Sequence, residues 1–193
     1  MQVIIGIDLA GKPENPTGLA LLEGKTVQSS LINTDEEPLK SIICNKPALT
    51  AIDAPFNPPK EGIQRKAERK MPEKGYRILP PSLAARRERA LQAMKLSTLM
   101  ANKGYKAIEV HSTSTRRVLD IPLKDWRKIQ TILIDIGLRE AVRTRTLVSH
   151  EIDAVTAALT AYLYLRGQTE SIGDEAEGYI TLPKKKDWRN LKV

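Results

Sequence analysis

The sequence predicts an α/β fold in which a mixed five-stranded sheet, three antiparallel strands followed by two parallel ones, is flanked by helices. Three apolar, β-branched runs come first, over residues 2–10, 17–22 and 26–32. Two further apolar runs, 48–53 and 105–110, alternate with segments of helical character. Closely spaced strands are typical of an antiparallel meander, whereas strands that alternate with helices are typical of parallel pairing.

The first run, residues 2–10, is almost continuously apolar, which indicates a strand covered on both faces and therefore central in its sheet. A turn rich in Gly, Pro and Asn follows it. The next two runs are separated only by Glu23-Gly24-Lys25, so we expect a three-stranded meander. Two short extended runs, near Ser171 and over 179–182, are candidates for a small edge element.

Four helices complete the pattern, and we expect them over 35–43, 83–102, 126–136 and 149–166. Asp35 and Ser149 are candidate caps, because short oxygen-bearing side chains accept from the first free N–H groups of a helix. Helix 83–102 should be amphipathic and end at Gly104. Its apolar face is predicted to carry Leu83, Ala84, Leu91, Met94 and Leu99.

We expect one domain over residues 1–183, with a proline-rich, loop-rich insertion at about 54–82 and a basic tail at 184–193. The chain has 193 residues, of which 41% are apolar, and this suits a single core. Cys44 is the only cysteine, so neither an internal disulfide nor a thiolate zinc site can form. The start at Met1 has no leader-like pattern and no run is long enough to span a membrane, so we expect a cytoplasmic protein without a membrane partner.

The net charge of +8 is concentrated in two segments. Residues 60–89 contain ten basic and four acidic side chains, and residues 184–193 contain five and one. Such clustering suits a polyanion, so nucleic acid is the predicted partner, either DNA or RNA. A solvated charged helix explains such a run equally well. The candidate nucleic-acid-binding residues are Arg65, Lys66, Arg69, Lys70, Arg86, Arg87 and Arg89.

Two acids stand at the ends of strands that are otherwise suited to burial. Asp8 ends the first apolar run, and Gly6 on the same face leaves space beside it. Asp53 ends the run 48–53, and Ala54-Pro55 then turns the chain away. A carboxylate that leaves water costs several kcal/mol unless a cation or hydrogen bonds compensate. A loop cap or an arginine partner would account for either acid alone.

A third acid belongs to the last predicted helix. His150 and Asp153 are three residues apart, so they project from one side of that helix. The same side carries several alanines and can lie flat against a sheet, so Asp153 should face the strands. A first-turn acid that interacts with the helix dipole is the alternative, and it explains Glu151 better than Asp153.

Carboxylate ligands without cysteines suit Mg²⁺ or Mn²⁺, and two such ions about 4 Å apart can hold a scissile phosphate and activate a water. The predicted chemistry is phosphodiester hydrolysis, with Asp53 as the bridging ligand. Glu109, on the strand 105–110, is a candidate for an additional ligand. His111 is a candidate for orienting a substrate phosphate or a ligand, and a packing role fits it as well.

The order of these elements and four motifs resemble a family of unknown function described as predicted RNase H-like nucleases, related to the RuvC branch of the RNase H-like superfamily. The motifs are Gly-Ile-Asp-Leu-Ala-Gly at 6–11, Ala-Ile-Asp-Ala-Pro-Phe at 51–56, Glu-Val-His at 109–111 and His-Glu-Ile-Asp-Ala at 150–154. No single motif is specific, but their order and separation are fairly so, and the likeness spans nearly the whole chain.

The resemblance implies an RNase H-like fold and a divalent-metal-dependent nuclease. It implies that Asp8, Asp53 and Asp153 are metal ligands, with Glu109 as a further one, and that His150 is a ligand or a water-activating group, as in the RuvC-type His-x-x-Asp. The insertion at 54–82 has no counterpart that we can match in RuvC resolvases.

Two other functions are compatible with such a chain. One is a non-catalytic nucleic-acid-binding protein of the same fold. The other is a phosphotransferase, because residues 6–11 followed by Thr17-Gly18 resemble the first phosphate loop of sugar kinases and actin-like ATPases. That reading requires a second glycine-rich phosphate loop, and the sequence contains no such motif.

Overall fold

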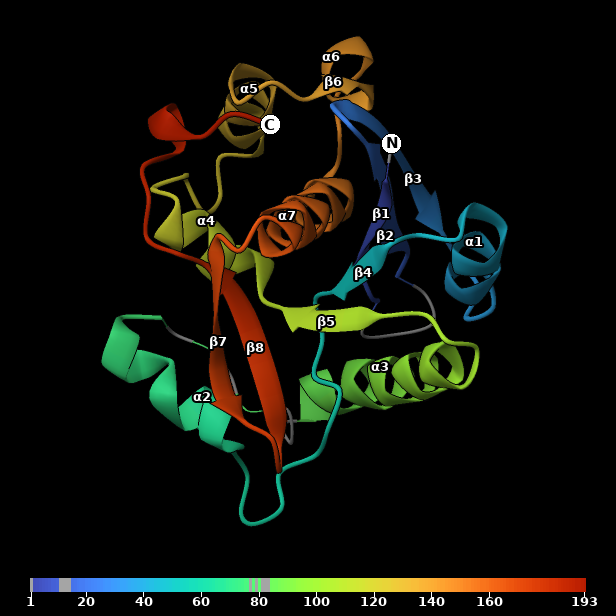
Figure 1. Ribbon diagram of the computed structural model, residues 1–193, viewed down its shortest axis with the longest axis vertical. Coiled ribbons are helices and arrows are strands. Elements are labelled where there is room, and N and C mark those ends of the chain that lie inside the picture. The colour runs from blue at the N-terminus through green and yellow to red at the C-terminus, as the bar shows by residue number, and fades with distance from the viewer. Residues whose placement is uncertain (1, 11–14, 77, 79, 81–83) are drawn as a thin grey trace.

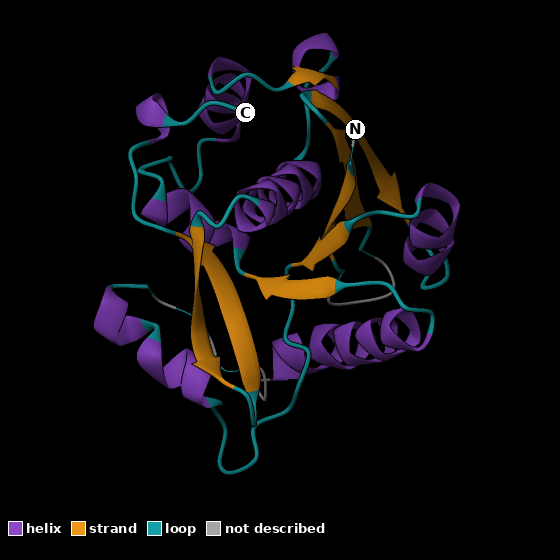
Figure 2. Cartoon of the chain, viewed as in Figure 1, coloured by secondary structure: helices purple, strands orange, loops and turns teal. Residues whose placement is uncertain are grey.

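The computed structural model describes residues 2–10, 15–76, 78, 80 and 84–193. Within this part of the chain eight strands form one sheet, in the order β6-β3-β2-β1-β4-β5-β8-β7 (Figures 1 and 2). The strands are β1 (Val3–Asp8), β2 (Thr17–Glu23), β3 (Thr26–Ile32), β4 (Leu49–Ile52), β5 (Ala107–Val110), β6 (Arg139–Glu140), β7 (Thr169–Asp174) and β8 (Gly178–Pro183).

The five predicted strands are present, with the predicted directions: β1, β2 and β3 are antiparallel, and β4 and β5 continue the sheet in parallel. The sheet is larger than five strands at both edges. The two short extended runs form the β7–β8 hairpin, in which β8 pairs in parallel with β5. At the opposite edge, two-residue β6 pairs with β3.

The four predicted helices are α1 (Glu37–Asn45), α3 (Ala84–Asn102), α5 (Trp126–Asp135) and α7 (Ser149–Leu165). The described part of the chain also contains five short helices that were not predicted: α2 (Lys66–Lys70), η1 (Pro72–Lys74), α4 (Ser112–Val118), α6 (Ala141–Thr144) and η2 (Trp188–Asn190).

Both predicted caps were wrong. Ahead of α1 it is the Glu37 carboxylate, not Asp35, that accepts from the backbone N–H groups of Asn33 and Thr34. Ser149 is the first residue of α7 rather than its cap, and the Glu151 carboxylate accepts from the N–H of Val148. In both places the longer side chain reaches back to the free N–H groups.

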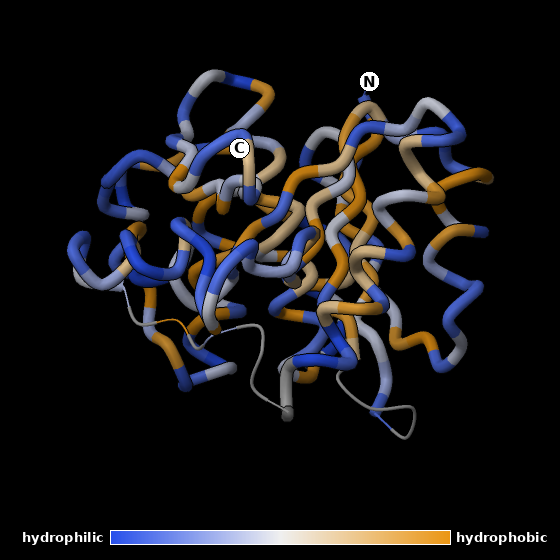
Figure 3. The backbone as a smooth tube through the Cα atoms, turned by 90° about the horizontal axis from the view of Figure 1, so that it is seen from below, coloured by the Kyte–Doolittle hydropathy of each residue, from blue (hydrophilic) through white to orange (hydrophobic). Residues whose placement is uncertain are grey.

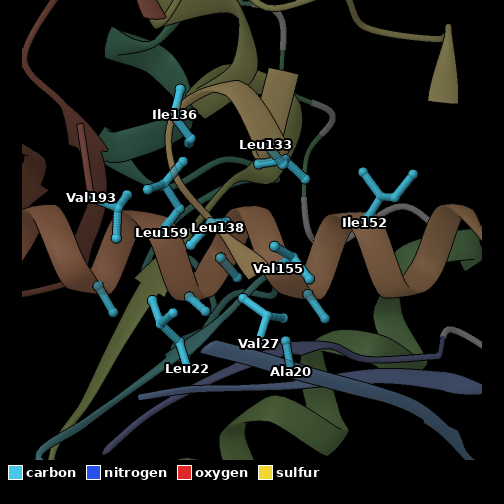
Figure 4. Packing of buried hydrophobic residues seen from close by; sticks show 14 of the residues in the cluster. Ala20, Leu22, Val27, Leu133, Ile136, Leu138, Ile152, Val155, Leu159 and Val193 are labelled. Carbon is cyan, nitrogen blue, oxygen red and sulfur yellow. The ribbon is translucent and has the colours of Figure 1, made fainter. Parts of the chain in front are cut away.

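Helices cover the two faces of the sheet in separate layers. On one face, α7 lies between the sheet and α5: Figure 4 shows Ala20 and Leu22 of β2 on one side of the helix and Leu133 and Ile136 on the other. On the other face, α1 and α3 pack through a second cluster that includes Ile5, Ile7 and Ile52. Each fully buried aliphatic side chain contributes about 1.5–3 kcal/mol. In Figure 3 hydrophobic stretches accordingly gather toward the middle of the molecule, while much of its periphery is hydrophilic.

The buried side of α3 differs from the predicted one. Ala93, Leu96 and Met100 face the sheet, whereas Leu91 and Leu99, which the sequence placed on the apolar face, are exposed. No helix among the described residues combines the length and hydropathy needed to cross a membrane.

Helix α7 lies unusually close to β1 and β2 because both strands have a glycine beneath it. A Cβ at Gly6 would be 2.1 Å from the carbonyl oxygen of Ala154, and one at Gly18 would be 2.0 Å from that of His150. Real Cβ atoms do not approach so closely, so only glycine allows this contact. The first turn of α7 is thereby placed directly over the end of β1.

The insertion at 54–82 is docked against the β7–β8 hairpin, with α2 beside β7 in Figure 1. Ala67 and Met71 are buried against Ile172, Ile180 and Leu182 of the hairpin. Three ion pairs join the two segments: Lys66 with Asp174 at 3.3 Å, Arg69 with Glu177 at 3.6 Å and Lys74 with Glu170 at 2.6 Å.

The predicted basic tail is also packed. The N–H of Trp188 donates to the carbonyl of Leu119, and the N–H of Val193 donates to that of Ile136. Leu191 and Val193 belong to the α7 core cluster. Lys184, Lys185 and Lys186 nevertheless remain exposed, so the tail keeps its positive surface.

Candidate active site

Asp8 and Asp53 lie at the same end of adjacent parallel strands. Ile7 of β1 is in register with Ile52 of β4, and the N–H of Asp53 donates to the carbonyl of Ile7 at 2.9 Å. Asp8 shares its sheet face with Gly6, and Asp53 continues the face of Ala51, so both side chains are on the α7 side. Both are buried, Asp8 at 2% and Asp53 at 7% exposure.

The first turn of α7 brings His150 and Asp153 to these two acids. In the antiparallel register Asp8 is opposite Gly18, on which the backbone of His150 rests. The Nδ1 atom of His150 is 2.7 Å from Oδ2 of Asp8. Asp153 follows one turn later and its side chain is 20% exposed. Four residues that the sequence singled out, Asp8, Asp53, His150 and Asp153, thus come together.

The electrostatics of the acids confirm that they interact. Burial raises the pKa of Asp8 above its usual value, and the neighbouring charge of Asp53 adds to this rise. Burial also raises the pKa of Asp153, to about 7, with Arg116 opposing the rise and the charges of Asp8 and Asp53 reinforcing it. The charge of Asp53 thus acts on both Asp8 and Asp153, and a local excess of carboxylate charge of this kind is what a cation site requires.

Neighbouring charges and hydrogen bonds also shift the pKa values of Asp53 and His150. Burial acts to raise the pKa of Asp53, but the charges of His111 and Arg89 and the hydrogen bonds from Ser112 outweigh it and leave that pKa lowered. The hydrogen bond to Asp8 raises the pKa of His150. His111, which the sequence marked as a candidate, is thus electrostatically coupled to Asp53, and its Nδ1 is 2.7 Å from Oγ of Ser114.

Two arginines already contact the acids. Arg89, from α3, has Nη2 3.4 Å from Oδ1 of Asp8 and a side chain that is 22% exposed. Arg116, from α4, pairs with Oδ1 of Asp153, and its side chain is only 2% exposed. The sequence had suggested Arg89 for nucleic-acid binding, whereas Arg116 was missed.

Helix α4 holds two of the three acids, although it was not predicted. The backbone N–H of Ser112 donates to Oδ2 of Asp53 at 3.1 Å, and the Ser112 hydroxyl donates to the backbone carbonyl of Asp153 at 3.0 Å. Arg116 lies one turn further on the same helix face. No local signal reveals these roles, because both partners come from distant segments.

The structure does not bring Glu109 to the cluster. Glu109 is in register with Ile52, so it points to the face opposite Asp53. There its carboxylate accepts from the Arg65 guanidinium and, at 2.9 Å, from the N–H of Phe56. Arg65 is 0% exposed and also pairs with Glu68, so it is a structural counter-ion rather than a phosphate-binding residue.

The other candidate nucleic-acid-binding residues have different surroundings. Lys66, Arg69, Lys70 and Arg87 are all exposed, and of these Lys66 and Arg69 are paired with acids of the β7–β8 hairpin. The side chain of Arg86 lies outside the described part of the structure. Among the candidates whose side chains are described, Arg89 contacts an acid of the cluster, and exposed Arg87 precedes it by two residues in the first part of α3.

The donor chemistry of the cluster fits a hard divalent cation, because three carboxylates converge without a thiolate. Among the described residues, however, no group of three or more His, Cys, Asp or Glu side chains has the spacing of a formed metal site. Oxygens of Asp8 and Asp153 face His150, Arg89 and Arg116 instead. A cation bound at Oδ1 of Asp8 and of Asp153 would have to displace Arg89 and Arg116, whereas His150 uses the other oxygen of Asp8.

Neither a family model nor a curated protein matches the chain. The solved structures that match it include two of RuvC. Thermus thermophilus RuvC in complex with a Holliday junction substrate has a TM-score of 0.50 and 19% identity, and the match covers 86% of this chain and 96% of that one. A second structure of Thermus thermophilus RuvC has a TM-score of 0.46, 18% identity and the same coverage.

The sheet order and the RuvC likeness define the class of the protein as an α/β chain of the RNase H-like fold. A solved structure that shares this fold is Thermus thermophilus RuvC in complex with a Holliday junction substrate. The resemblance to the family of predicted RNase H-like nucleases stays a prediction.

Proposed function

We propose that this chain is a nuclease that hydrolyses phosphodiester bonds of nucleic acid and depends on Mg²⁺ or Mn²⁺. One observation carries the proposal: Asp8, Asp53 and Asp153, from three distant segments, share one buried electrostatic cluster beside His150. The RNase H-like fold supports it further, since the fold brings the ends of β1 and β4 and the start of α7 to the same place.

Asp8, Asp53 and Asp153 would hold the cation, which when bound supplies a water of lowered pKa and a positive charge for the phosphate. Ser112 fixes Asp53 through its backbone N–H. Asp8 orients His150 through Nδ1, which leaves Nε2 as the nitrogen that can hold or release a proton at the reacting water or the leaving oxygen. His150 is 34% exposed, so this nitrogen can be reached from solvent.

Arg89 and Arg87 are proposed to bind the phosphate backbone. Arg89 is partly exposed and close to Asp8, so a phosphate that it binds would lie at the acids. RuvC is recorded with a Holliday junction, and a junction is therefore one of the substrates to test. DNA, RNA and hybrid duplexes are the others.

The decisive test compares the wild type with Asp8→Asn, Asp53→Asn and Asp153→Asn on labelled DNA, RNA, hybrid and junction substrates, each with Mg²⁺, Mn²⁺ or EDTA. We expect cleavage by the wild type that EDTA abolishes and that falls on the order of 100-fold or more in each variant. Asp135→Asn, at an exposed acid of α5, is the matched control. Equal cleavage by all variants would contradict the proposed site. Binding without cleavage by the wild type would favour the non-catalytic alternative.

Metal binding can be tested separately from cleavage. Titration of the wild type with Mn²⁺, followed by electron paramagnetic resonance, should show binding that Asp53→Asn weakens, because Asp53 is the central carboxylate of the cluster. Unchanged binding in this variant would remove Asp53 from the proposed ligand set.

The nucleic-acid surface can be tested through its salt dependence. Neutralising Arg87 and Arg89 should lower affinity and reduce the slope of log K against log salt by about one for each lost phosphate contact. An unaltered slope would mean that the first part of α3 is simply a solvated helix.

A further inference from the structure

Arg116 is a buried cation whose ionic partner belongs to the proposed metal site. Its side chain is 2% exposed and pairs with Oδ1 of Asp153. The guanidinium lies over the ring of Trp126, 5.3 Å from the centroid. A charge removed from water in this way requires an opposite charge, and Asp153 provides it.

The next residue shows that this burial is specific. Arg117 is exposed and donates to the backbone carbonyl of Gly75, although it belongs to the same short helix. Arg116, by contrast, has a buried Nε without a hydrogen-bond partner among the described residues. Burying Arg116 therefore leaves its Nε–H without a hydrogen bond, which is unfavourable, while its guanidinium contacts Asp153. Packing alone does not explain why Arg116 is buried.

A divalent cation bound to Oδ1 of Asp153 would compete with the Arg116 guanidinium for that oxygen. An ion that binds Oδ1 of Asp153 would meet a positive charge already in contact with that atom. Like charges at such a distance repel strongly in a buried site. Ser112, on the same face of α4, holds the backbone of Asp153 and the carboxylate of Asp53, so the acids stay in place if the guanidinium moves away.

We propose that Arg116 is a positioning residue that acts as the resident counter-ion of Asp153: it neutralises the carboxylate while no divalent cation is bound and must be displaced when one binds. The inference rests on the proposed function. Arg116 then stabilises the metal-free protein and lowers its affinity for the cation. It makes metal binding, and hence activity, responsive to the free cation concentration.

The test measures Mn²⁺ binding to the full chain by electron paramagnetic resonance, together with the Mn²⁺-induced rise in Tm. We expect Arg116→Gln to bind Mn²⁺ about tenfold more tightly than the wild type and to show a larger rise in Tm. Arg116→Lys, which keeps the charge, should stay close to the wild type. Arg117→Gln is the matched control on the same helix and should not change either readout.

Equal or weaker Mn²⁺ binding by folded Arg116→Gln would overturn the inference, since Arg116 would then be structural or would help to bind the ion. If that variant does not fold, Trp126→Leu replaces it: this removes the ring beneath the guanidinium, and a smaller increase in affinity is expected. No increase in Trp126→Leu would equally overturn the inference. Failure of the proposed function is distinguishable, because wild type and Asp53→Asn would then bind Mn²⁺ equally or not at all.

Discussion

Replacing Asp153 by asparagine should flatten the pH dependence of stability in the metal-free protein. Burial, reinforced by the charges of Asp8 and Asp53, raises the pKa of Asp153 from 3.8 to about 7. Between these values the folded chain holds a proton that the unfolded chain has released. A state that binds more protons is favoured at low pH, so the free energy of unfolding falls as the pH rises through this window and stays low above it.

The magnitude follows from the same shift. The difference between 3.8 and about 7 corresponds to about 4 kcal/mol lost from the free energy of unfolding at high pH. Asparagine cannot ionise, so Asp153→Asn removes this contribution, while that of Asp8 remains. The variant also leaves Arg116 without its carboxylate and lowers absolute stability, so the slope against pH, not the stability itself, is the informative quantity.

The assay is urea unfolding in EDTA at several values between about pH 5 and about pH 8.5. The wild type should lose stability as the pH rises, and Asp153→Asn should lose about 2.7 kcal/mol less over this range, because only the roughly two pH units between pH 5 and the pKa of about 7 are sampled. Asp135→Asn, at an exposed acid, should keep the wild-type slope. Identical slopes for the wild type and Asp153→Asn would refute the argument that this carboxyl group is buried among like charges.

Three further substitutions test other parts of the molecule. Gly18→Ala should destabilise the fold by about 1–3 kcal/mol and weaken Mn²⁺ binding, because the new Cβ would lie 2.0 Å from the carbonyl oxygen of His150. Wild-type values for unfolding and for binding would mean that α7 is not in close contact with β2. Arg65→Met should lower the free energy of unfolding in chemical denaturation by about 3–5 kcal/mol, because it leaves Glu109 buried without its cation. A decrease below about 1 kcal/mol would contradict that pairing. Arg69→Gln should leave the salt slope of nucleic-acid binding unchanged in fluorescence anisotropy, because Arg69 is paired with a hairpin acid, and a flatter slope would show that this pair opens on binding.

The parts of the fold that the sequence predicted are those with a strong local pattern. The strand over 2–10 was identified by a continuous apolar run, and Asp8 and Asp53 by their positions at strand ends. The spacing of His150 and Asp153 on an alanine-rich helix was enough to direct both toward the sheet. Each of these inferences needs only a few neighbouring residues.

The parts that it did not predict depend on distant partners. Helix α4 begins with four Ser and Thr residues and ends with Val, which have low helix propensity, and only its two arginines favour a helix. Tertiary contacts such as those of Ser112 and Arg116 therefore contribute to its structure. Glu109 was misjudged because a change of one residue in a strand reverses the face, and the register with Ile52 fixes the face away from Asp53. The sequence did not show that Arg65 is buried, because Glu109, the acid that pairs with Arg65, is far away in the sequence.

The docking of α2 on the β7–β8 hairpin ties an early segment to a very late one. During synthesis the residues around Ala67 emerge long before Ile172 and Ile180, which cover them in the finished molecule. Until then the lysines and arginines of α2 lack the acids of the hairpin that neutralise them. A nascent chain of this protein therefore carries an uncovered, strongly cationic segment, and completion of the fold must wait for residues 169–183.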